Sequence, residues 1–99
     1  MSSIRLINVV MNLKKILFDS NKNVVSRILR ERRLAAGLTQ AQLAARMQTL
    51  GVNLDQQMIS RIESNRRFVT DYELACFCRV LKLSTEEALA DFYENYGKE

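Results

Sequence analysis

Four side-chain signals for the start of a helix divide the chain, and they constrain its fold more than any other feature of the sequence. Three are capping boxes, in which a Ser or Thr and a Glu or Gln three residues later satisfy the first free amides of a helix. The boxes begin at Thr39, Thr70 and Ser84, and Asp55 is a single N-cap. The 99 residues include no proline and three glycines, so little interrupts the segments between these signals.

Apolar residues recur at helical spacing between the signals and predict five helices. The first is expected from about Asn23 to Ala36 and the others begin near residues 40, 56, 71 and 85, with Gly37 and Gly51 ending the first two. The predicted fold class is therefore all-α. We expect a domain at residues 23–92, an N-terminal extension at 1–22 in which 12–18 could form a short helix, and a C-terminal tail at 93–99.

Charge is distributed unevenly along the chain. Residues 1–67 hold twelve Lys or Arg and four Asp or Glu, a formal charge of +8, whereas residues 68–99 carry −4. A basic part beside an acidic part suits a surface that binds a polyanion and a separate end that contacts protein. No apolar run approaches the roughly 20 residues of a membrane-spanning helix, and the opening stretch lacks the features of a secretory signal. We therefore expect a cytoplasmic protein.

The residue types present argue against a metal site and against catalysis. The chain has no histidine, and its two cysteines are Cys76 and Cys78. Zinc sites need about four well-spaced donors, so small buried side chains in a reducing cytosol are the better interpretation. There is also no glycine-rich phosphate loop, and the basic part has few aromatic side chains for stacking RNA bases. We expect no cofactor, no metal and no enzymatic activity.

The order of the motifs adds a family resemblance. An arginine-rich helix is followed by Gly37-Leu38-Thr39-Gln40, then by Leu43-Ala44, and later by the Ile-Ser-Arg-Ile-Glu-Ser-Asn-Arg-Arg run at residues 59–67. Over about residues 25–90 this arrangement resembles the lambda-repressor/Cro-like helix-turn-helix family, also called the XRE family. Extra residues around 48–53 make the chain similar to the subgroup in which the second helix and the turn are extended. The resemblance implies a five-helix DNA-binding domain and a transcriptional regulator, expected to be a repressor.

The helix that begins after Asp55 is the expected recognition helix. A major groove about 12 Å wide admits one α-helix, whose N-terminal residues meet the base edges. Gln can bond adenine and Arg can bond guanine, each pair discriminating by about 1–3 kcal/mol. The resemblance places a Gln pair at this helix start. The residues expected to contact bases are Gln56, Gln57, Met58, Ser60 and Arg61, although solvated surface explains Gln56 and Ser60 equally well.

A second set of residues is expected to bind the DNA backbone or to hold the fold. Gln40 opens a helix, where the dipole favours phosphate. The expected phosphate contacts are Gln40, Arg46, Asn65, Arg66 and Arg67, the last three forming the loop that grips the backbone in the family. The resemblance also implies a structural ion pair between Arg33 and Glu63, which fixes the first helix against the third.

Partners follow from the size of the domain. A lone helix-turn-helix of this size holds DNA weakly, so we expect a homodimer on a palindromic operator of double-stranded DNA. The last helix and tail could supply the dimer surface through Leu89, Phe92, Tyr93 and Tyr96, although core packing explains Leu89 and Phe92 equally well. The alternative is an antitoxin or adaptor of the same fold that acts mainly through contacts with a protein partner.

Overall fold

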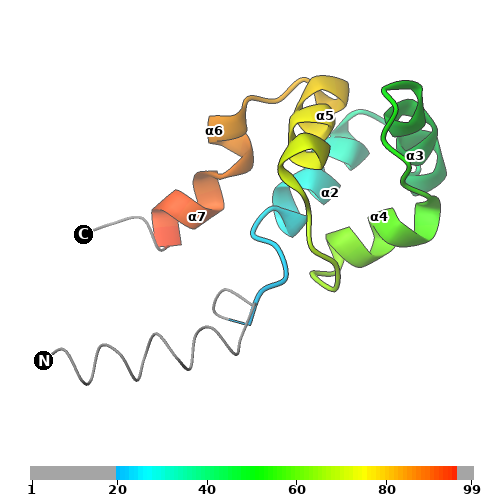
Figure 1. Cartoon of the computed structure of the whole chain (residues 1–99). Helices are drawn as coiled ribbons and strands as arrows, with labels where there is room; N and C mark the ends of the chain where they lie inside the picture. Colours follow the sequence, from blue (N-terminus) through cyan, green and yellow to red (C-terminus); the bar gives the residue numbers. More distant parts are fainter. Residues whose placement is uncertain (1–19, 96–99) are drawn as a thin grey trace, which may run out of the picture.

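The structure, a computed structural model, describes residues 20–95, and this part of the chain contains six helices and no strand (Figure 1). The predicted all-α class is confirmed. The expected short helix at 12–18, as well as Tyr96, lies outside the described residues. The helices are α2 (Ser26–Ala35), α3 (Gln40–Thr49), α4 (Gln56–Glu63), α5 (Asp71–Leu81), α6 (Thr85–Ala88) and α7 (Ala90–Asn95).

The capping signals set the helix starts as predicted. All three capping boxes are formed, with the hydroxyls of Thr39, Thr70 and Ser84 accepting from the backbone amides three residues later. Asp55 accepts from the amide of Met58 at 2.8 Å and caps α4. The first two interhelical turns contain Gly37 (φ +72°) and Gly51 (φ +83°), in the left-handed region that strains other residues.

Two predicted boundaries were wrong. α2 begins at Ser26 rather than Asn23, because the Asn23 side chain accepts from the Val25 amide and donates to the carbonyls of Ile62 and Arg67. Asn23 therefore belongs to the turn before the helix. The predicted last helix is two short helices, because the backbone at Leu89 (φ −100°, ψ 8°) leaves the helical region.

The core lies between α2, α3, α4 and α5, while α6 and α7 extend from one end (Figure 1). α2 and α3 each contact both α4 and α5, and α6 joins α7 to α5. The largest fully buried side chains are Leu29, Leu43, Met47, Leu54, Ile59, Ile62 and Phe77. None of the helices between residues 20 and 95 has the length and apolar character needed to span a membrane.

The long turn between α3 and α4 is anchored at several points. Val52 and Leu54 are buried in the core, and the side-chain amide of Gln48 donates to the Leu54 carbonyl at 2.9 Å. Because Val52 and Leu54 are held in the core, the chain enters α4 from a fixed position. Of the extra residues around 48–53, Val52 joins the core and Gln48 ties the turn to Leu54, while the others are exposed.

Glu73 combines a cap with an ion pair at the start of α5. Its side chain is buried, accepts from the Thr70 amide at 3.0 Å and pairs with Arg67 at 3.0 Å. Burial alone would raise the pKa of Glu73, but hydrogen bonds from Arg67 and Thr70 outweigh it and hold the pKa below the ordinary 4.5. The folded state therefore favours the ionised carboxylate.

We predict that Glu73 makes the stability of the protein fall at acidic pH. A carboxylate whose folded pKa is lowered stabilises the fold above its unfolded pKa, and this contribution is lost as pH falls through the folded pKa. The free energy of unfolding should decline from about pH 5 to pH 3, and less steeply in Glu73→Gln. Urea denaturation at a series of pH values measures this. Glu87 and Asp91, whose pKa values are also lowered, account for the pH dependence that remains in Glu73→Gln. Parallel curves of the free energy of unfolding against pH for the variant and the unaltered protein would contradict the prediction.

Candidate nucleic-acid interface

α4 has a buried side and an exposed side set by its sequence. Ile59 and Ile62 are almost completely buried, whereas Gln57 and Arg61 are exposed and lie four residues apart on the opposite side. Within residues 20–95 neither the Gln57 side chain nor the Arg61 side chain makes a hydrogen bond or an ion pair. Both side chains are thus free to bind a ligand from a helix that is rigidly packed beneath them.

The other residues expected to contact bases are less accessible. Met58 is half-buried and packs against the core, and Ser60 is half-buried. Gln56 is exposed, but its amide nitrogen donates to Oε1 of Gln40 at 2.9 Å. Its own oxygen remains available as an acceptor.

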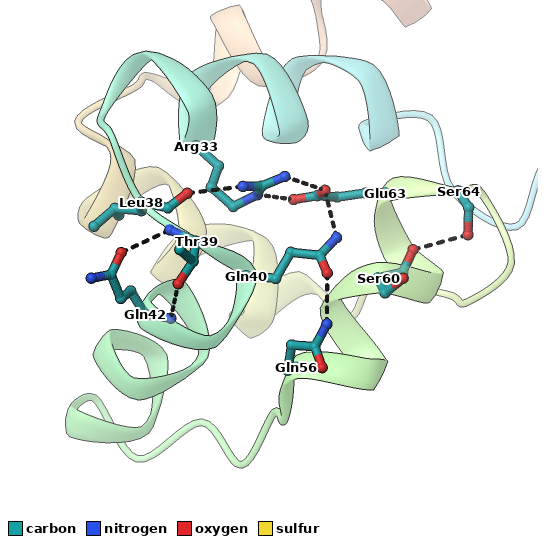
Figure 2. Close-up of polar contacts among 9 residues, drawn as sticks. All are labelled: Arg33, Leu38, Thr39, Gln40, Gln42, Gln56, Ser60, Glu63 and Ser64. Atoms are coloured by element: carbon teal, nitrogen blue, oxygen red, sulfur yellow. Dashed lines mark hydrogen bonds and ion pairs between the residues drawn. The ribbon is translucent and has the colours of Figure 1, made fainter.

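A chain of polar side chains connects three helices behind this surface. Figure 2 shows Arg33 from α2 facing Glu63 from α4, with Gln40 and Gln56 continuing the chain toward the start of α4. Glu63 Oε1 accepts from Arg33 Nη2 at 2.9 Å and from Gln40 Nε2 at 3.0 Å. Gln40, an expected phosphate contact, is therefore joined directly to Gln56, an expected base contact. Sequence reasoning missed this link, because the two residues are sixteen positions apart.

The ion pair at the centre of this network is bidentate and shielded from water. Arg33 Nε donates to Glu63 Oε2 at 2.6 Å, and Nη1 donates to the Leu38 carbonyl at 2.8 Å. The two side chains are 9% and 5% exposed. Hydrogen bonds to Glu63 raise the pKa of Arg33 against the opposing effect of burial. The pair fixes the angle between α2 and α4 and thereby orients the exposed side of α4.

The loop after α4 is held by two side chains that had been expected to bind phosphate. Asn65 adopts a left-handed conformation (φ +60°), and its Oδ1 accepts from the amides of Lys22 and Asn23 at 2.9 and 3.1 Å. Arg67 pairs with Glu73 and donates to the Phe68 carbonyl. Arg66 is exposed, and its side chain hydrogen-bonds only to Ser64 among the described residues. Of the three, Arg66 is the residue most available to a ligand.

Exposed arginines without a carboxylate partner add positive charge to α2, α3 and α4. Within the described part of the chain these are Arg30 on α2, Arg46 on α3, Arg61 on α4 and Arg66 in the loop after it, whereas the exposed Arg79 lies on α5. Arg30 was not selected from the sequence, yet it lines a hollow with Leu34 and Glu63, beside the end of α4. The sequence could have indicated Arg30 through its position three residues before Arg33, because that spacing places both residues on one side of α2. Unpaired cations of this kind attract phosphate.

The cysteines and α7 offer less. Burial raises the pKa of the Cys78 thiol, and no group of three or more His, Cys, Asp or Glu among residues 20–95 could hold a metal ion. In α7, Phe92 packs edge-on against Tyr93, with ring centroids 5.5 Å apart. Tyr93 is 54% exposed, whereas Leu89, just before α7, packs against the core.

Comparison with known proteins agrees with this geometry. A family model described as a helix-turn-helix domain matches residues 25–92, which includes all the helices from α2 to α6 and the start of α7. No curated protein and no solved structure matches the chain. Domains of this family are DNA-binding modules of regulators. Because that match covers more than half of the chain, the chain belongs to the helix-turn-helix domain family of the XRE/Cro-like type.

Proposed function

We propose that the protein is a sequence-specific, double-stranded DNA-binding transcriptional regulator of the cytoplasm, which inserts α4 into the major groove and represses by occupying its operator. The observation that carries this proposal is the pairing of a rigid buried side of α4 with an exposed side that presents Gln57 and Arg61 unpaired. An α-helix with side chains is about 10–12 Å across, which fits a major groove about 12 Å wide.

Base contacts are assigned first to Gln57 and Arg61. Gln57 can bond adenine N6 and N7, and Arg61 can bond guanine O6 and N7. Gln56 contributes its free oxygen as an acceptor, held in place by Gln40. Met58 and Ser60, both half-buried, are left with apolar or single hydrogen-bond contacts at the edge of the same surface.

Backbone contacts are assigned to the main-chain amide of Gln40 at the start of α3, because both ends of its side chain are engaged, and to the side chains of Arg46 and Arg66, with Arg30 as an addition from α2. The side chains of Asn65 and Arg67 are engaged within the protein, so we assign them to holding the loop that presents Arg66. Phosphate contacts of this kind set register and carry no sequence information.

A homodimer on a palindromic site completes the proposal. Two copies reading half-sites about one helical turn apart double the contact surface of one small domain. The exposed Tyr93 ring on α7 supports this end of the molecule as the dimer surface.

Selection of bound sequences from random duplex DNA tests the function. We expect enrichment of a two-fold palindrome whose half-sites contain the adenine and guanine that Gln57 and Arg61 bond. Failure to enrich any sequence, together with a stoichiometric protein partner that co-purifies, would instead identify the antitoxin or adaptor of the same fold.

A further inference from the structure

An apolar hollow of about 250 Å³ lies at the point where the chain enters the described domain. Its apolar walls come from the segment before α2, the α4–α5 loop, α5 and the residue after α6: Val24, Val25, Phe68, Val69, Leu74 and Leu89. Most of these pack against the core, but Phe68 is 42% exposed. A closed apolar cavity of about 150 Å³ can hold a benzene ring, so this hollow has room for an aromatic ring and more.

Hydrogen bonds fix the chain at the rim of the hollow. Asn21 and Lys22 are both lining residues. Asn65 donates to Oδ1 of Asn21 at 2.6 Å and accepts from the Lys22 amide at 2.9 Å. Asn21 therefore gives the preceding chain a fixed attachment point beside the opening of the hollow.

We propose that the apolar segment Leu13–Phe18 of the same chain covers this hollow, with Phe18 as the side chain that enters it. Phe18 is three residues before Asn21, and three residues of extended chain reach at most about 11 Å. A connection this short gives the segment an effective concentration in the millimolar range or above. A separate partner at micromolar concentration competes poorly with it.

The chemistry of the segment matches the hollow. Leu13, Ile16, Leu17 and Phe18 are apolar, and the first three recur at the spacing of one side of a helix. Apolar contact between this segment and the walls of the hollow therefore favours the placement. This inference is independent of DNA binding, because no residue assigned to bases or phosphates lines the hollow.

A tryptophan probe tests the placement in the full chain. The protein has no tryptophan, so Phe18→Trp gives a single emission that reports its surroundings. We expect blue-shifted emission, protected from acrylamide and unchanged on dilution. In a double variant that also carries Phe68→Ser, the emission should shift to the red. In the matched double variant with Tyr72→Ser it should stay unchanged, because Tyr72 is an exposed aromatic residue outside the hollow. Emission like that of the denatured protein would overturn the proposal, and a blue shift lost on dilution would assign the hollow to a second copy.

A second measurement does not depend on altering the wall of the hollow. In Phe18→Ser the methyl resonances of Val69, Leu74 and Leu89 should shift, because they lose the ring current of Phe18. Those of Leu43 and Met47, which lie elsewhere in the core, should not. We also expect the melting temperature to fall by about 5–10 °C. Unchanged methyl resonances in the hollow would refute the proposal even if the melting temperature fell.

Discussion

Replacing Glu63 with alanine is expected to lower the free energy of unfolding by about 3–5 kcal/mol. The substitution leaves the Arg33 guanidinium in a site where its side chain is 9% exposed, without the carboxylate that neutralises it. Removing one partner of a buried pair is costly mainly because the other charge stays buried. Domains of this size are stable by about 5–15 kcal/mol, so the variant should be close to unfolding at ordinary temperatures.

The matched control is Glu31→Ala. Glu31 also pairs with an arginine, Arg27, at 2.5 Å, but both side chains are 56% exposed. Exposed pairs contribute about 0–1 kcal/mol, so the control should unfold within that range of the unaltered protein. Gln40→Ala removes only the amide branch of the network and should cost about 1 kcal/mol. Urea denaturation at neutral pH measures all three variants.

The same variant separates a structural from a functional role for Glu63. At a temperature where part of the Glu63→Ala protein remains folded, that fraction should prefer the same DNA sequence as the unaltered protein. A variant with normal stability and an altered sequence preference would show that Glu63 acts at the interface rather than in the fold.

Local signals account for most of what could be predicted from the sequence. Thr39, Asp55, Thr70 and Ser84 identify helix starts because each cap needs only residues within one turn. The division at Leu89 was missed because no proline or glycine marks it, and it becomes evident only from the backbone angles. Asn23 was assigned to a helix because its bonds to Ile62 and Arg67 are made across the fold.

The polar contacts of the candidate site show the same limit. A pattern can nominate Asn65, Arg66 and Arg67 together, because all three are polar and adjacent. Which of them is free depends on partners far along the chain or on the next helix: Asn23 for Asn65, and Glu73 for Arg67. The folded structure is therefore needed to identify Arg66 as the exposed residue of the three. It is also needed to choose the mutations that test the site.

Replacing Gln57 or Arg61 with alanine is expected to relax sequence preference at one operator position each, by about 1–3 kcal/mol or roughly 5- to 150-fold. Stability should stay within about 0.5 kcal/mol, because both side chains are exposed and have no partner among the described residues. Competition binding with operators altered one base pair at a time measures the effect. If α4 lies in the major groove, the two variants lose discrimination at different positions of the same half-site.

Arg66→Ala provides the contrast that makes this result interpretable. A phosphate contact is lost equally on every sequence, so Arg66→Ala should weaken all duplexes alike and reduce the salt slope by about 1. Arg79→Ala, an exposed arginine on α5 outside the α3–α4 pair, should change neither preference nor slope. If Gln57→Ala and Arg61→Ala also weakened binding to all duplexes alike, α4 would contact the DNA backbone and not the base edges. If Gln57→Ala and Arg61→Ala instead lose discrimination at separate operator positions while Arg66→Ala weakens binding to every sequence, the exposed side of α4 must face the base edges.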